Sequence, residues 1–127
     1  LAQSSMIGEI TPACAEAGYP APATTGEVMQ VIYNSLADDY RRAIAALQSL
    51  TGKTYESVNI VGGGSQDGYL NQMAANVTGL PVYAGPTEGT ALGNLIVQFI
   101  AAGEYADLQA ARDAIKQSFA IQEVLPQ

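Results

Sequence analysis

Residues 57 to 84, SVNIVGGGSQDGYLNQMAANVTGLPVYA, decide the fold. Ser57 to Val61 is short, β-branched and bounded by turn residues, which predicts a strand that runs directly into three glycines. A helix should follow, because apolar residues recur at helical spacing and Gly79 stands where a helix would end. Those apolar residues are Leu70, Met73, Ala74 and Val77. Leu80 to Ala84 predicts a second strand, parallel to the first because a helix joins them. The order indicates an α/β fold with few parallel strands and flanking helices.

Helices are expected on both sides of this unit. Thr24 and Glu27 are spaced as a capping box at the start of a long amphipathic helix that Gly52 ends. Thr87 to Ala102 predicts a further helix, and Asp107 can cap a last one. The residues expected on the buried side of the 87 to 102 helix are Ala91, Leu92, Leu95, Ile96, Phe99 and Ile100.

These elements divide the chain into three parts. Residues 1 to 23 form an initial segment and connector, with a short helix at about Met6 to Ala17 and clustered proline and glycine after it. Residues 24 to 119 hold the order helix, strand, helix, strand, helix, helix, and residues 120 to 127 are a tail. Two short parallel strands are too small a sheet to be stable alone. We therefore expect the rest of a longer chain, or a homo-oligomer partner, to complete the sheet.

Composition narrows the class of protein. In 127 residues, 48% are apolar and 13% are charged, which is typical of a folded chain. No apolar run approaches the roughly 20 residues of a membrane span, and no basic head or apolar core marks a signal peptide. We therefore expect no membrane association and a cytoplasmic location. The net charge of -7 argues against nucleic acid as a partner. A start at Leu1 rather than Met is compatible with a processed product or with a piece of a longer chain.

The chain contains no histidine, and Cys14 is its single cysteine. An internal disulfide, the usual zinc sites and a Ser-His-Asp triad are therefore excluded. Any catalysis would have to rest on carboxylates, lysine, tyrosine or the backbone, and we name no catalytic residue and no metal ligand in this sequence.

The most informative motif is Gly62-Gly63-Gly64-Ser65-Gln66 between strand and helix. Glycines let a ligand approach the backbone, and the start of the following helix favours an anion such as a phosphate. A tight turn without any ligand explains the spacing equally well. No lysine or arginine occurs between Thr54 and Ala111, so a metal ion or another part of the protein would have to neutralise a nucleotide. The segment between Thr54 and Ala111 therefore looks like only half of a nucleotide site.

Two familiar nucleotide fingerprints fail. G-x-G-x-x-G would require glycine at Asp67. Gly52-Lys53-Thr54 has the end of a P-loop, but Leu47 occupies the first glycine position, so we interpret Gly52 as a helix C-terminus.

Other polar and small residues have structural interpretations. Gly89 and Gly93 would let the helix of residues 87 to 102 approach another backbone closely, and Glu88 suits its dipole. The charges at residues 38 to 42 indicate a solvated helix face.

Residues 61 to 98, VGGGSQDGYLNQMAANVTGLPVYAGPTEGTALGNLIVQ, resemble the C-terminal domain of the FGGY carbohydrate kinases, most closely the rhamnulokinase group. The resemblance extends from about Met6 to about Ile115. The joint occurrence of VGGGSQ, LNQMAA and AGPTEGTALGN is far more specific than the triple glycine. The resemblance implies that residues 1 to 127 are the C-terminal part of the second of two actin/hexokinase-like (ribonuclease H-like) ATPase domains.

The resemblance also implies which positions bind the cofactor. These are Gly62, Gly63, Gly64, Ser65 and Asp67, with Gly63 the strongest, and the cofactors are ATP and Mg2+. Similar kinases tend to carry asparagine where this chain has Asp67. An ionised carboxylate can accept a hydrogen bond from the adenine amino group but cannot donate one to a ring nitrogen, which limits the recognition expected of Asp67.

The function implied is transfer of the ATP γ-phosphoryl group to a ketose, giving L-rhamnulose 1-phosphate. The catalytic base and the sugar-binding residues would lie upstream of Leu1, so this chain alone should be inactive. Two alternatives stay open at this point. One is a kinase of the same family for L-fuculose or xylulose, and the other is a non-catalytic α/β interaction module.

Overall fold

The structure is a computed structural model that describes residues 5 to 127, so the first four residues of the predicted initial segment lie outside it. The elements are α1 (Met6–Glu16), α2 (Thr25–Thr51), β1 (Val58–Ile60), the 3-10 turn η1 (Gly63–Gln66), α3 (Gly68–Thr78), β2 (Val82–Ala84), α4 (Gly89–Ala101), α5 (Leu108–Ser118) and β3 (Gln122–Val124). Five α-helices and a small sheet confirm the predicted α/β class. None of the described helices combines the length and hydropathy needed to cross a bilayer.

The sheet has three strands in the order β1-β2-β3. β1 and β2 are parallel, as predicted, with Val58 opposite Val82. β3 is antiparallel to β2 and places Val124 opposite the same Val82. Residues 120 to 127 had been expected to form only a tail, because Gln122–Val124 is short and mostly polar and carries no strand signal of its own. Its pairing with β2 makes β2 the central strand.

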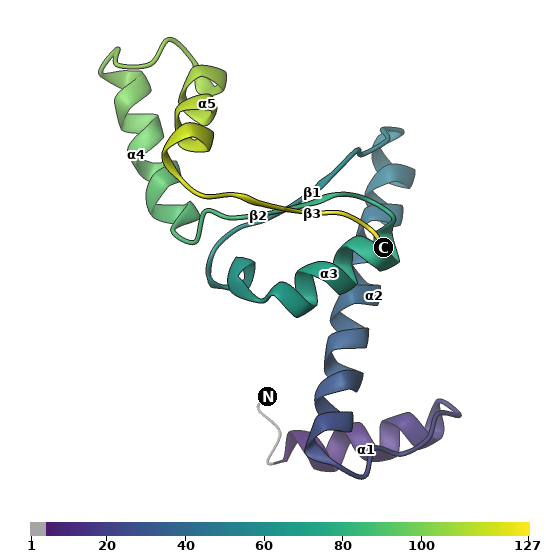
Figure 1. Ribbon diagram of the computed structural model, residues 1–127. Coiled ribbons are helices and arrows are strands. Elements are labelled where there is room, and N and C mark those ends of the chain that lie inside the picture. The colour runs from purple at the N-terminus through teal and green to yellow at the C-terminus, as the bar shows by residue number, and fades with distance from the viewer. Residues whose placement is uncertain (1–4) are drawn as a thin grey trace.

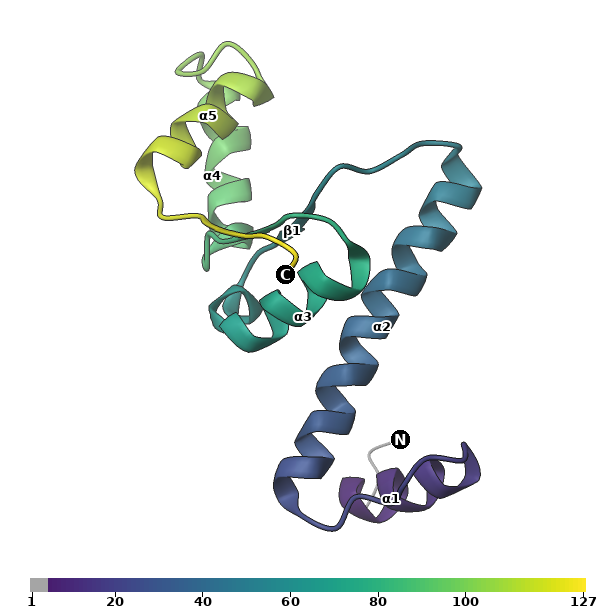
Figure 2. The same cartoon turned by 45° about the vertical axis from the view of Figure 1, so that its right-hand side comes forward.

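The core lies between the sheet and α3. Val82 is fully buried and packs with Ala74 and Ala75 of α3 and with Val124 of β3. α3 in turn packs along α2 (Figures 1 and 2), where the rings of Tyr33 and Tyr69 meet edge to face at 5.3 Å. The small alanines let α3 lie close to the sheet, which fixes the start of α3 relative to β1.

Helices α1, α4 and α5 lie apart from this core. α1 sits at the far end of α2, and α4 and α5 form a helical hairpin at the opposite end (Figures 1 and 2). On α4, Ile96 is buried, but Leu95 and Phe99 are 45% and 44% exposed. The prediction that one broad face of this helix is buried was therefore wrong for Ala91, Leu95 and Phe99. Leu95 and Phe99 line a small hollow against α5 that stays open to solvent.

Most helix ends follow the predicted signals. The Thr24–Glu27 capping box is present, and Asp107 caps α5 by accepting a hydrogen bond from the Ala110 N–H at 2.9 Å. Gly52 and Gly79 end their helices in the left-handed conformation. Gly52 is thus a helix C-terminus, as interpreted above, and not part of a P-loop.

Candidate functional site

The candidate site lies beyond the carboxyl ends of β1 and β2. A loop follows each strand, and the two loops are joined by their backbones. The Gly62 N–H donates to the Pro86 carbonyl at 3.1 Å, and the Gly85 N–H donates to the Ile60 carbonyl at 2.8 Å. VGGGSQ and AGPTEG, which are distant in sequence, therefore lie side by side. Ligands of open parallel sheets commonly bind at this end of the strands.

The glycine turn, residues 62 to 67, is closed by its own hydrogen bonds. Gly62 has a φ of 83°, which favours glycine. Its carbonyl accepts from the Ser65 N–H at 3.0 Å and from the Ser65 hydroxyl at 2.7 Å. The Asp67 N–H donates to the Gly64 carbonyl at 3.2 Å. Ser65 is buried beneath the turn, so it shapes the turn from inside.

Gly63 and Gly64 form the outer side of the turn. Both are exposed, and neither has a positive φ. A Cβ atom added to either would meet no atom of the described chain within 4 Å. Packing within this structure therefore gives no reason for glycine at these two positions, whereas a ligand lying against the backbone would.

Asp67 caps α3 and ties it to α2. One carboxylate oxygen accepts from the Leu70 N–H at 3.0 Å, and the other accepts from the Tyr33 hydroxyl at 2.7 Å. The Leu70 N–H and then the Tyr33 hydroxyl lower the pKa of Asp67, because both favour the ionised carboxylate. Both oxygens thus have partners within the chain. This gives Asp67 a structural role, and its contact with a nucleotide stays a prediction.

Asn71 is a site residue that the sequence analysis missed. It is fully buried on the first turns of α3, and its side-chain amide donates to the Ser65 carbonyl at 2.9 Å. Ala74 and Ala75 follow it at the i+3 and i+4 spacing of a helix face. Its position three residues before Ala74, beside the predicted apolar face, was the signal that could have found it.

The second loop is packed against the first. A Cβ on Gly89 would lie 3.1 Å from the Val61 Cβ, so Gly89 allows a close approach to a side chain rather than to a backbone. Gly93 has no atom of the described chain within 4 Å of a built Cβ, so its predicted close approach is not seen here.

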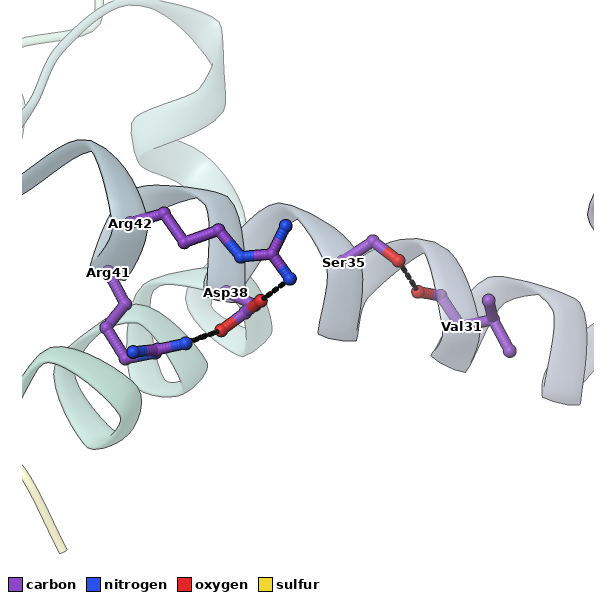
Figure 3. Close-up of polar contacts among 5 residues, drawn as sticks. All are labelled: Val31, Ser35, Asp38, Arg41 and Arg42. Atoms are coloured by element: carbon purple, nitrogen blue, oxygen red, sulfur yellow. Dashed lines mark hydrogen bonds and ion pairs between the residues drawn. The ribbon is translucent and has the colours of Figure 1, made fainter. Parts of the chain in front are cut away.

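A separate hollow of about 780 Å3 lies between α1, the connector and α2. None of its lining residues belongs to the glycine turn. On its wall, Asp38 pairs with Arg41 at 2.6 Å and with Arg42 at 2.7 Å (Figure 3). The arginine side chains are 53% and 71% exposed, which confirms the predicted solvated face.

Residues 2–102 match the profile of the FGGY family of carbohydrate kinases, C-terminal domain. The chain belongs to this family. As an FGGY C-terminal domain it has the actin/hexokinase-like fold, in agreement with the predicted fold class.

Relatives of this FGGY domain carry the name rhamnulokinase. The chain is 42% identical over 119 residues to rhamnulokinase of Halalkalibacterium halodurans, covering 94% of this chain and 26% of the relative. It is 43% identical over 122 residues to rhamnulokinase of Bacillus subtilis, covering 96% and 25%. For rhamnulokinase of Bacteroides thetaiotaomicron the values are 38% over 114 residues, 90% and 24%. The chain thus spans about a quarter of the length of the curated relatives that it matches.

Proposed function

We propose that residues 1 to 127 form the C-terminal, nucleotide-binding part of the second ATPase domain of a sugar kinase. The lengths of the relatives support this, since the chain covers about a quarter of each. Exposed apolar side chains support it too. Leu50 is 84% exposed and Val97 is 66% exposed, at positions of α2 and α4 that the described chain leaves uncovered. In the full-length protein, the remaining domains would cover such surfaces and extend the small sheet.

The full-length protein would transfer the γ-phosphoryl group of ATP to the terminal hydroxyl of L-rhamnulose, giving L-rhamnulose 1-phosphate and ADP. The relatives named rhamnulokinase motivate this substrate. An aspartate outside this chain would receive the hydroxyl proton. The isolated chain should therefore be inactive, and ATP-dependent phosphorylation of L-rhamnulose by it would contradict the proposal. A cytoplasmic location stays a prediction.

The main support for nucleotide binding is the backbone of Gly63 and Gly64. It is exposed, lies just beyond the carboxyl end of β1, and has no neighbouring atom that would obstruct a ligand. Such a backbone presents N–H donors to an anion, whereas the start of α3 is already capped by the Asp67 carboxylate. The segment from Thr54 to Ala111 has no cationic side chain. Mg2+ and the rest of the enzyme would supply the positive charge.

The substitution Gly63→Val in the full-length protein tests this proposal. A branched side chain on the open backbone should weaken Mg-ATP binding about tenfold or more, which corresponds to about 1.4 kcal/mol or more. Isothermal titration calorimetry measures the affinity. The matched control is Gly26→Val, at an exposed glycine of α2 with only an ordinary contact at 3.9 Å. Unchanged affinity in a folded Gly63→Val protein would count against a nucleotide at the turn.

A coupled assay across ketoses tests the sugar. We expect L-rhamnulose to give the highest kcat/KM. A higher kcat/KM for L-fuculose or xylulose would keep the kinase chemistry and replace the substrate.

A further inference from the structure

The two buried polar residues of the described chain both belong to the glycine turn and its support. Ser65 is 8% exposed and Asn71 is fully buried, while the other buried residues are apolar. Asn71 is also among the largest fully buried side chains, beside Val82. Polar burial is thus concentrated beneath Gly63 and Gly64 rather than spread through the core.

Hydrogen bonds connect Asn71 to the turn in two steps. The Asn71 side-chain amide donates to the Ser65 carbonyl at 2.9 Å. Ser65 in turn donates to the Gly62 carbonyl, through its hydroxyl at 2.7 Å and its backbone N–H at 3.0 Å. Gly63 and Gly64 lie in sequence between Gly62 and Ser65, which these bonds join. The amide of Asn71 therefore restrains the peptide that closes the open part of the turn.

Asn71 has an energetic disadvantage that its amide donor must offset. Its Oδ1 is buried and has no hydrogen-bond partner among the described residues. Buried polar atoms without partners destabilise a fold and are rare in native proteins. Leucine has the same branched shape and number of side-chain heavy atoms, is larger, and would leave no orphan oxygen. The feature that only the asparagine provides is the donor to Ser65.

We infer that Asn71 is a positioning residue, which holds the Gly63–Gly64 backbone in the conformation that receives the nucleotide phosphates. This inference rests on the proposed function. It concerns the cofactor and not the sugar, so it predicts an effect on one substrate only.

The test uses two variants of the full-length protein with opposite packing errors. Asn71→Leu adds volume and removes the donor, and Asn71→Ala removes the donor and leaves space. Both should raise the KM for Mg-ATP about tenfold, with the KM for the ketose within about twofold of wild type. The control is Asn76→Ala, an exposed asparagine of the same helix whose amide contacts Gln72 and Gln127 and not the turn.

Hydrogen exchange separates this inference from the proposed function. The N–H groups of Ser65 and Asp67, which bond to Gly62 and Gly64, should exchange faster in both Asn71 variants and not in Asn76→Ala. Absence of Mg-ATP binding to the wild-type protein would refute the proposed function, even if exchange at the turn responds as expected. Given a wild-type protein that binds Mg-ATP, unchanged exchange, or faster exchange with an unchanged KM for Mg-ATP, would overturn the inference. Loss of folding in both variants would assign Asn71 a structural role and would overturn it as well.

Discussion

The loops after β1 and β2 both contain glycines, but they use them differently. In the second loop, Gly85 has a φ of 120°, and a Cβ on it would lie 2.9 Å from the Ala120 carbonyl oxygen. At the start of α4, which follows this loop, a Cβ on Gly89 would lie 3.1 Å from Val61. In the first loop, Gly63 and Gly64 have neither a positive φ nor a neighbour within 4 Å in the described chain. Packing and backbone conformation account for the glycines at positions 85 and 89 but not for those at positions 63 and 64.

This difference bears on the two interpretations of the triple glycine that its spacing left open. A turn that is purely structural needs glycine only where the backbone or a neighbour demands it, as at Gly62 with its positive φ. At Gly63 and Gly64, neither the backbone conformation nor a neighbouring atom requires glycine. The comparison therefore favours a ligand at the first loop and a packing role for the second.

The largest stability effect should come from Gly85→Ala. The new methyl group would combine a backbone conformation that disfavours side chains with a clash against the Ala120 carbonyl. We expect a loss of about 3 kcal/mol in the free energy of unfolding. Denaturant unfolding of the full-length protein measures it, with Gly63→Ala as the control, which should stay within about 0.5 kcal/mol of wild type. Equal losses at the two positions would remove the distinction between the loops.

A smaller loss is expected from Gly89→Ala. Its methyl group would press on the Val61 side chain at 3.1 Å, and overpacking of this kind costs about 1–2 kcal/mol. The double variant Val61→Ala/Gly89→Ala creates room for the methyl group and should recover part of the loss. The same denaturant experiment gives the coupling between the two positions. Additive losses would show that Gly89 and Val61 do not constrain each other.

The local part of the fold was predictable from sequence. Thr24 and Asp107 cap helices, and Gly52 and Gly79 end them, because these signals act within one turn of the chain. The parallel pairing of β1 and β2 also followed from the connecting helix. Spacing and residue type were sufficient in each case.

Features that depend on contacts between distant segments were not predictable in this way. β3 is a strand only because β2 is beside it, and part of the demand for glycine at Gly85 comes from Ala120, which is remote in sequence. For Asn71, the helix face was visible in the sequence, but its partner at Ser65 was not. At the site, sequence marked the open glycines, and only the structure showed what supports them.

The smallest effect concerns how the first loop is anchored to α2. The Tyr33 hydroxyl donates to Asp67 at 2.7 Å, so side chains rather than close backbone packing fix the end of this loop. Tyr33→Phe removes this bond and should lower the unfolding midpoint near neutral pH. The matched control is Tyr19→Phe, at a tyrosine that is 70% exposed, and it should leave the midpoint unchanged.

The pH dependence of the difference in unfolding midpoint between wild type and Tyr33→Phe tests whether the hydrogen bond to Asp67 causes it. The pKa of Asp67 is lowered in the folded protein by the Leu70 N–H and the Tyr33 hydroxyl, so the stabilisation is fully present above the ordinary value of 3.8 and is lost as pH falls through the lowered pKa. The pKa of Tyr33 is raised, chiefly because its hydroxyl donates to Asp67, so the same stabilisation is lost as pH rises above the ordinary value of 10.0 and through the raised pKa. Wild type and Tyr33→Phe should therefore differ most between these limits and converge at both extremes. A difference that persists unchanged in strong acid would mean that Tyr33 stabilises the loop through its ring contact with Tyr69, and that the hydrogen bond to Asp67 contributes little.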